Sequence, residues 1–125
     1  MANPNIVNVT TIYGNTSSTS LTTTSATSLV SNAASSGKVF KINSIVVANV
    51  DGTNNTEVTV NVYSQAALAG TAFPLVSTIV VPADASLIVT DKTTSFYLLE
   101  NQSIGATAGV ANDLVVTASW EEINS

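Results

Sequence analysis

The abundance of residues branched at Cβ restricts this chain more than any other feature of its sequence. Of the 125 residues, 43 are Thr, Val or Ile. Branching at Cβ limits the χ1 angle and favours the pleated surface of a strand over a helix. Eight or nine strand-like runs are separated by short turn signals, as in sandwiches and barrels. The sequence therefore predicts an all-β fold, an antiparallel β-sandwich, for which a jelly roll is one arrangement.

The distribution of Ser and Thr divides the chain into two parts. Residues 16–36 contain 14 Ser or Thr among 21 positions and offer few large apolar side chains for a core. We interpret residues 1–36 as an N-terminal strand, at 6–13, followed by an extended arm, and residues 37–125 as the β-sandwich domain. Because such an arm needs a surface to hold it, we expect it to cross onto another subunit and add backbone hydrogen bonds there. Deleting residues 1–30 would then abolish assembly and leave a folded sandwich.

The second part shows the clearest strand patterns. Residues 38–50 form a long apolar run, and residues 51–55 (DGTNN) are turn formers that link it to a second run at 57–63. These two runs predict a hairpin. One phase of the first run is shared by Phe40, Ile42, Val46, Ala48 and Val50. In the last run, at 114–121, the phase expected to face the core contains Leu114, Val116, Ala118 and Trp120.

Charged side chains are scarce, and this limits the partners of the protein. They make up 9% of the chain, against about 25% in soluble domains, and the net charge is −5. Three lysines do not form the cationic stripe that nucleic-acid binding needs, and an acidic protein is repelled by an anionic membrane. We therefore expect neither partner. A surface with so few charges needs hydroxyls, amides or other chains to cover it, so we expect a homo-oligomer that also contacts other proteins.

The residue types that are missing exclude most enzyme chemistry. The chain contains no Cys, His or Arg. Thiol catalysis, disulfide bonds and Cys/His zinc sites are therefore excluded, and a Ser-His-Asp triad would lack its base. Glu121 and Glu122 are adjacent, so on a strand they point to opposite faces and form no carboxylate pair. Asp84 and Asp91 flank a short predicted strand, and nothing accompanies them. The sequence predicts a protein that is not an enzyme and has no catalytic residues and no cofactor.

One loop offers a set of oxygen ligands. Asp51, Asn54, Asn55 and Glu57 lie within seven residues, and calcium prefers oxygen ligands. Their spacing is not that of an EF-hand, because the glycine is second and Asp51 has a single acidic companion. Asp-Gly and Asn-Asn also suit a tight turn, since these residues tolerate positive φ. We expect no bound metal and keep these four residues as the calcium candidate.

Two tyrosines leave a carbohydrate-binding function as an alternative. Tyr63 and Tyr97 do not fall in the predicted core phases, whereas Phe40 and Trp120 do. A sugar-binding face needs several exposed aromatic rings in a row on adjacent strands. The sequence alone does not place the tyrosines in such a row.

Three stretches of the chain resemble a known class of protein. They are residues 39–54 (VFKINSIVVANVDGTN), 81–87 (VPADASL) and 114–123 (LVVTASWEEI). These stretches, together with residues 3–9 (NPNIVNV), are similar to small virion structural proteins of tailed bacteriophages, above all those of marine cyanobacterial phages. The resemblance covers about residues 37–124 and consists of strand and turn patterns without a catalytic signature.

The resemblance implies a β-sandwich subunit that is made in the host cytoplasm and carried on the virion. We expect a capsid decoration, or cement, subunit that bridges neighbouring major capsid proteins and so stabilises the shell. By analogy, a cyclic trimer is one state that such a subunit would adopt. The alternatives are a virion protein of the tail, neck or fibre, a module that binds host glycans, and a calcium-dependent adhesion domain.

Overall fold

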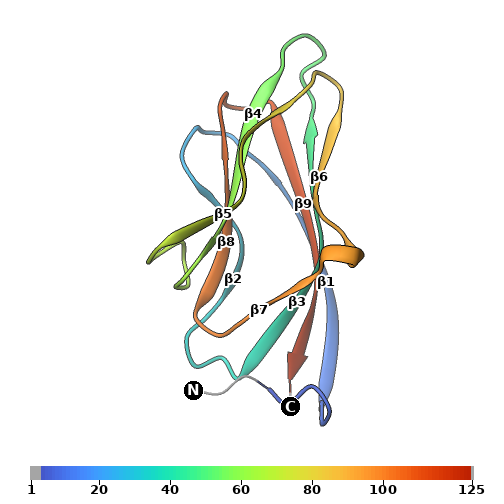
Figure 1. Ribbon diagram of the computed structural model, residues 1–125, viewed down its shortest axis with the longest axis vertical. Helices are drawn as coiled ribbons and strands as arrows, with labels where there is room; N and C mark the ends of the chain where they lie inside the picture. Colours follow the sequence, from blue (N-terminus) through green and yellow to red (C-terminus); the bar gives the residue numbers. More distant parts are fainter. Residues whose placement is uncertain (1–3, 125) are drawn as a thin grey trace.

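The structure, a computed structural model, describes residues 4–124, which form two antiparallel β-sheets packed face to face (Figure 1). These residues form nine strands and one short 3-10 helix: β1 (Thr11–Ser20), β2 (Thr27–Asn32), β3 (Lys38–Asn49), β4 (Thr56–Tyr63), β5 (Ala72–Val81), β6 (Ser86–Thr90), η1 (Lys92–Thr94), β7 (Phe96–Leu98), β8 (Gln102–Ala108) and β9 (Leu114–Asn124). Among them no helix is long and apolar enough to cross a bilayer.

The order of the strands identifies the topology. One sheet has the order β1-β9-β3-β6, with β7 also paired to β3, and the other has the order β2-β8-β4-β5. Strands of the first half of the chain therefore pair with strands of the second half in reverse order: β1 with β9, β2 with β8, β3 with β6 and β7, and β4 with β5. A long antiparallel hairpin rolled into two sheets is a jelly roll. The predicted all-β antiparallel sandwich is confirmed.

The core lies between the two sheets and is built of aliphatic side chains. The fully buried residues at its centre include Leu21, Ile42, Ile45, Val47, Val60, Leu98, Ile104, Leu114 and Val116. The rings of Phe40 and Trp120 stack at one end, with centroids 6.4 Å apart and planes inclined by 29°. On β9 the predicted alternation is confirmed, because Leu114, Val116 and Ala118 are buried and Trp120 packs against them.

Two buried asparagines join the sheets at opposite ends of β3. The Nδ2 atom of Asn32, on β2, donates to the carbonyl oxygens of Lys38 (3.0 Å) and Leu98 (3.2 Å), which belong to the other sheet. The Nδ2 atom of Asn49, at the end of β3, donates to the carbonyl oxygen of Val81 on β5 (2.9 Å). Buried polar groups are costly unless they are bonded, so both asparagines fix how the sheets pack.

The Ser/Thr-rich region is part of the sandwich, which corrects the predicted boundary at residue 36. β1 pairs with β9 over ten residues and β2 pairs with β8, both within this chain. Leu21, Leu29 and Val30 are buried in the common core. Residues 11–32 therefore lie on the sheets of their own chain instead of forming an arm, and deleting residues 1–30 would remove β1 and most of β2.

Local details of three predicted strands also differ from the structure. The strand predicted at 6–13 begins instead at Thr11 and continues through Gly14 to Ser20. The register of β3 against β9 shifts between Ile42 and Ser44, so the buried residues after the shift are Ile45 and Val47 instead of Val46 and Ala48. The hairpin predicted around residues 51–55 is wrong, because β3 and β4 belong to different sheets and this loop crosses between them.

Candidate functional site

The calcium candidate lies in the loop between β3 and β4, where its oxygens have partners within the chain. Oδ1 of Asp51 accepts a hydrogen bond from the amide of Thr53 (2.8 Å), and Oδ2 accepts one from Nδ2 of Asn54 (3.2 Å). These bonds, that from Thr53 first, lower the pKa of Asp51 because they stabilise its charged form. Oδ1 of Asn55 accepts from a backbone amide after β5 (3.2 Å), and Glu57 is exposed on β4. The geometry is that of a loop closed by its own side chains.

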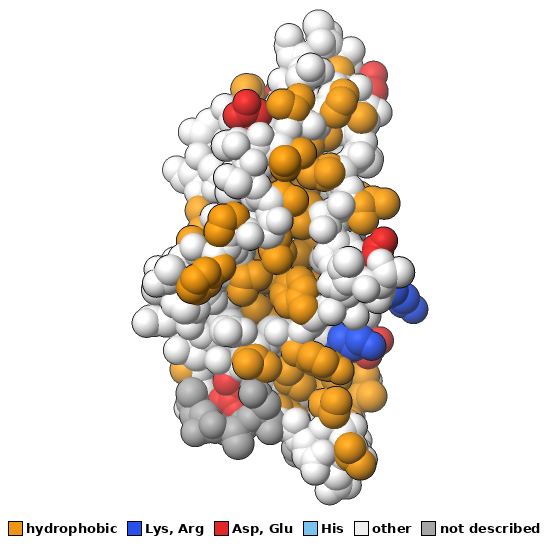
Figure 2. Space-filling view, viewed as in Figure 1, with side chains coloured by type: hydrophobic (Ala, Val, Ile, Leu, Met, Phe, Trp, Pro, Cys, Tyr) orange, Lys and Arg blue, Asp and Glu red, His pale blue; other side chains and the backbone are white. Residues whose placement is uncertain are grey.

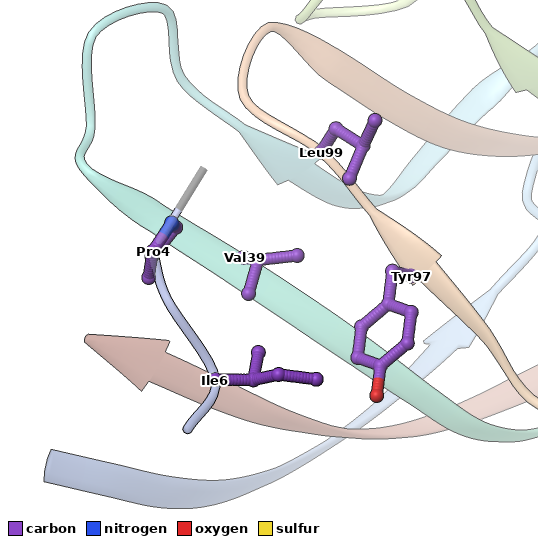
Figure 3. A pocket seen from close by; sticks show the side chains of 5 residues that line it. All are labelled: Pro4, Ile6, Val39, Tyr97 and Leu99. Atoms are coloured by element: carbon purple, nitrogen blue, oxygen red, sulfur yellow. The ribbon is translucent and has the colours of Figure 1, made fainter. Parts of the chain in front are cut away.

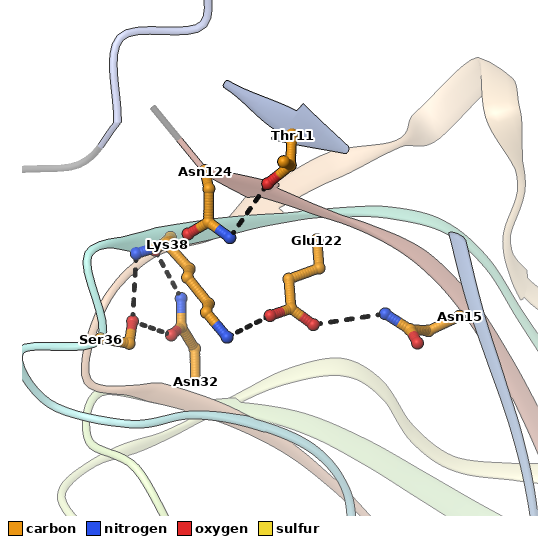
Figure 4. A network of polar contacts seen from close by, with 7 residues as sticks. All are labelled: Thr11, Asn15, Asn32, Ser36, Lys38, Glu122 and Asn124. Carbon is orange, nitrogen blue, oxygen red and sulfur yellow. Dashed lines mark hydrogen bonds and ion pairs between the residues drawn. The ribbon is translucent and has the colours of Figure 1, made fainter. Parts of the chain in front are cut away.

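Glu121 and Glu122, which are adjacent on β9, have different side-chain partners within the chain. Oε1 of Glu121 accepts from Nδ2 of Asn43 (3.3 Å). Glu122 forms an ion pair with Lys38 and accepts from Nδ2 of Asn15 (3.5 Å), within the network of Figure 4. Within residues 4–124, no three acidic side chains come close enough together to hold a metal ion.

Asp91 caps the short helix η1, and Asp84 lies in the turn before β6. The hydroxyl and the amide of Thr93 donate to Asp91 and lower the pKa of its carboxyl group. Asp84 has a positive φ of 57°, and its amide donates to the carbonyl oxygen of Asp51 (3.2 Å). Both aspartates therefore stabilise the turns in which they lie, a common role of Asp in proteins.

The exposed aromatic side chains of the described strands do not form a row. Tyr13 lies on β1, Phe73 on β5 and Tyr97 on β7, and their exposed fractions are between 43% and 58%. β9 and β3 separate β1 from β7, and β5 belongs to the other sheet. Tyr63 is half-buried at the end of β4. This arrangement differs from the face of adjacent rings that a glycan-binding module uses.

An apolar seam runs along the side of the sandwich where β5 and β6 form the edges of the two sheets. Residues on β5 that pair with the inward-facing valines of β4 are themselves partly exposed. Phe73, which pairs with Val62, is 58% exposed, and Ile79, which pairs with Val58, is 40% exposed. Other partly buried side chains continue this surface, and we define the open seam as Phe73, Val76, Ile79, Leu87, Val89 and Phe96. Figure 2 shows hydrophobic side chains gathered in a band along the molecule between its two halves. The core is therefore not closed on this side.

The edge strand β5 is irregular, which determines how the seam can be covered. Its register against β4 shifts twice, between Val58 and Val60 and between Val60 and Asn61. Thr78 has a positive φ of 46°, and Pro74 has no amide hydrogen to donate. Bulges and prolines interrupt the backbone ladder that an added strand would need. The seam is thus suited to contact through side chains more than to the addition of a strand.

A second apolar surface lies on the outer face of the sheet that contains β1, β9 and β3, near the chain termini. Ile12, Ile123 and Val39 are neighbours across β1, β9 and β3, and Leu99 follows β7 beside them. We call these four residues the outer row. Val39 and Ile123 are almost fully buried, at 2% and 5%, although they do not belong to the core cluster between the sheets.

Two residues of the segment 4–9 lie beside Val39 and Leu99 of this outer row. Pro4 and Ile6 line a pocket of about 220 Å³ together with Val39, Tyr97 and Leu99 (Figure 3). The pocket is almost entirely apolar. Four of its five lining side chains are aliphatic and the fifth is Tyr97, so its walls offer mainly packing contacts.

Comparison with known proteins supports the fold and leaves the function open. No protein-family model matches the sequence, and no curated protein matches it. A solved structure described as "Bacillus endospore appendages form a novel family of disulfide-linked pili" is similar in fold, with a TM-score of 0.51 and 21% sequence identity over 92% of this chain and 90% of that chain. A likeness at this identity shows that the two chains share a β-sandwich fold.

Proposed function

We propose that this protein is a non-enzymatic structural subunit that is incorporated into an assembly of many protein chains through its open seam. The exposure of inward-facing side chains at this seam is the observation that carries the proposal. The absence of Cys and His from the sequence, together with the separate partners of its acidic groups, supports a role without catalysis.

The strength of a contact at the seam favours a repeating assembly over an isolated pair. Fully burying an aliphatic or aromatic side chain contributes about 1.5–3 kcal/mol. Covering the exposed parts of the six seam side chains would then contribute on the order of 5 kcal/mol. Association itself costs about 4–15 kcal/mol, so one such contact is weak. On a lattice or filament each subunit makes several contacts at once, and avidity makes weak contacts sufficient.

For the identity of the assembly, we propose a phage virion, with capsid decoration as its most specific form. The stretches at 39–54, 81–87 and 114–123 resemble small virion proteins, and a compact sandwich without chemistry suits a subunit that bridges neighbours in a shell. Mass spectrometry of gradient-purified virions tests this proposal, and the position of the subunit in a particle map distinguishes head from neck or tail. Absence of its peptides from the particles would contradict a virion role.

A filament is the second candidate, and the structural neighbour is the observation that favours it. That neighbour is described as belonging to pili linked by disulfide bonds. The present chain has no Cys, so copies of it would have to be joined by non-covalent contacts. Negative-stain electron microscopy of the purified protein distinguishes filaments from discrete oligomers.

Substitutions at the seam test the proposal that this surface makes the contact. Light scattering after gel filtration should show the wild type above monomer mass at high concentration. Phe73→Lys and Ile79→Lys should each return it to a monomer, because a charge at the seam opposes burial. Val110→Lys is the matched control, since Val110 is also apolar and 50% exposed but lies between β8 and β9.

Fluorescence of Trp120 during unfolding shows whether each variant is folded, and Phe73→Ser replaces Phe73→Lys if the latter is not. A wild type that stays monomeric at every concentration would overturn the proposal. So would seam variants that associate as well as the wild type.

A further inference from the structure

Residues 4–9 form a segment that lies outside both sheets, and its residues Pro4 and Ile6 line a pocket with Val39 and Leu99 of the outer row. Pro4 is buried, whereas Ile6 is 52% exposed and Val7 is 91% exposed. Pro4 and Ile6 lie beside Val39, a residue on the outside of the sheet that is only 2% exposed. The apolar side chains of the segment are therefore divided between the wall of this pocket and solvent.

The connections of the segment are local. The amide of Asn8 donates to the carbonyl oxygen of Asn5 (3.1 Å), and the amide of Val7 donates to Oδ1 of the same asparagine (2.9 Å). The amide of Thr10 donates to the carbonyl oxygen of Asn124 (2.7 Å) where β1 begins. The bond at Thr10 fixes one end of the segment, so residues 4–9 can rotate about this point without loss of a strand pair.

The conformation of the segment disagrees with its sequence. Ile6, Val7 and Val9 favour an extended strand, and the sequence predicts one there. In the structure, residues 6–8 form a turn. Natural sequences normally agree with their structure at every level, and a local conflict of this kind is expected where a segment has a second use.

We propose that residues 4–9 exchange between copies of this chain, so that the segment of one copy packs on the outer row of the next. Pro4 and Ile6 already lie beside Val39 and Leu99 within one chain, so the same contacts with a second copy require no new complementarity. Exchange of an identical element is a low-cost route to association. The segment carries no charged residue, so exchange brings no repulsion from it between two chains of net charge −5.

The inference deepens the proposed function and rests on it, because exchange links copies that the seam brings together. The two surfaces have different places in the fold. The seam lies along β5 and β6 and includes Phe96 of β7, whereas the outer row crosses β1, β9 and β3. A subunit that uses both surfaces has distinct contacts to two neighbours, as a lattice or filament requires.

Single-cysteine variants test the exchange, because the natural chain contains no Cys. Ile6→Cys is prepared in one batch of full-length protein, and Leu99→Cys is prepared in a second batch that carries a tag to separate the two by mass. The batches are mixed, incubated and treated with a short bismaleimide. A cross-linked heterodimer is expected, and it should increase with protein concentration. Thr53→Cys in place of Leu99→Cys is the control, because Thr53 is exposed in the loop at the other end of the molecule and should give none.

The double variant Ile6→Cys/Leu99→Cys distinguishes the failure of this inference from that of the proposed function. If the wild type associates but the mixed batches do not cross-link, while the double variant links within one chain, the exchange is wrong and the seam proposal stands. If the double variant does not link at all, the segment does not occupy the outer row and the exchange is also wrong. A wild type that is monomeric throughout refutes the proposed function and the exchange together.

Discussion

Asn49 gives the sharpest test of how the two sheets are held together. Its side chain is 3% exposed and makes three hydrogen bonds. Nδ2 donates to the carbonyl oxygens of Asn54 (3.0 Å) and Val81 (2.9 Å), and Oδ1 accepts from the amide of Asp51 (2.9 Å). One side chain thus connects β3, the loop that follows it and the edge strand β5.

We expect Asn49→Ala to be strongly destabilising. Each hydrogen bond contributes about 0.5–1.5 kcal/mol net, so the loss of three corresponds to about 1.5–4.5 kcal/mol. For a domain of this size, such a loss lowers Tm by roughly 5–20 °C. Asn49→Asp keeps the size and the acceptor but loses both donors, so it should be at least as destabilising as alanine.

Urea unfolding followed by fluorescence measures this effect, because Trp120 is the single tryptophan and packs against the core. Asn54→Ala is the control. The side chain of Asn54 is exposed and donates to Asp51, while the backbone oxygen that Asn49 needs remains, so we expect a change within about 0.5 kcal/mol. A loss below about 1 kcal/mol for Asn49→Ala, or a stable Asn49→Asp variant, would refute the view that these bonds hold the sheets.

Three further predictions concern other parts of the fold. Leu21→Ala removes a fully buried side chain from the region predicted as an arm, so it should lower the free energy of unfolding in urea by about 2–5 kcal/mol. Thr22→Ala, at an exposed position, is the control, and an equally small loss for both variants would contradict the place of Leu21 in the core. The bonds from Thr93 keep the pKa of Asp91 below its ordinary value of 3.8, so the stability that they contribute is present above pH 3.8 and disappears as the pH falls through the lower folded-state pKa. The stability difference between wild type and Asp91→Asn should therefore shrink below pH 3.8, and a constant difference down to strongly acidic pH would speak against this. Because the oxygens of Asp51 already accept bonds within their loop, Tm should be the same with calcium and with a chelator, whereas a lower Tm in chelator would establish the calcium candidate.

The sequence predicted the buried residues best where core-facing and outward-facing residues alternate regularly along a strand. On β9 every second residue from Leu114 to Ala118 faces the core, and no register shift interrupts its pairing with β1. On β3 the alternation fails at Asn43, because a bulge there adds one residue and reverses the faces that follow. A bulge leaves little mark on a run of apolar residues such as 45–48, so the phase could not be predicted from the sequence.

Long-range pairing explains why the sequence wrongly predicted a hairpin around residues 51–55 and an arm in the Ser/Thr-rich region. Residues 51–55 have the composition of a hairpin loop, but the sheet to which β4 belongs is decided by its partners β8 and β5. Residues 11–20 are rich in Ser and Thr, yet they form a strand because β9 supplies backbone partners along their whole length. The open seam had a visible signal, since residues 72–81 are apolar in both phases, but the sequence does not show that this strand is an edge.

The pairing of β1 with β9 has a consequence for how the molecule acquires its structure. The first strand of the sandwich has its whole ladder on the last one, about a hundred residues later in the chain. Contacts between such distant residues make folding slow, because a large loop must close before they form. During synthesis β1 must wait, unpaired, until β9 has left the ribosome. The sheet that contains β1 is therefore completed only after the last strand of the chain has been made.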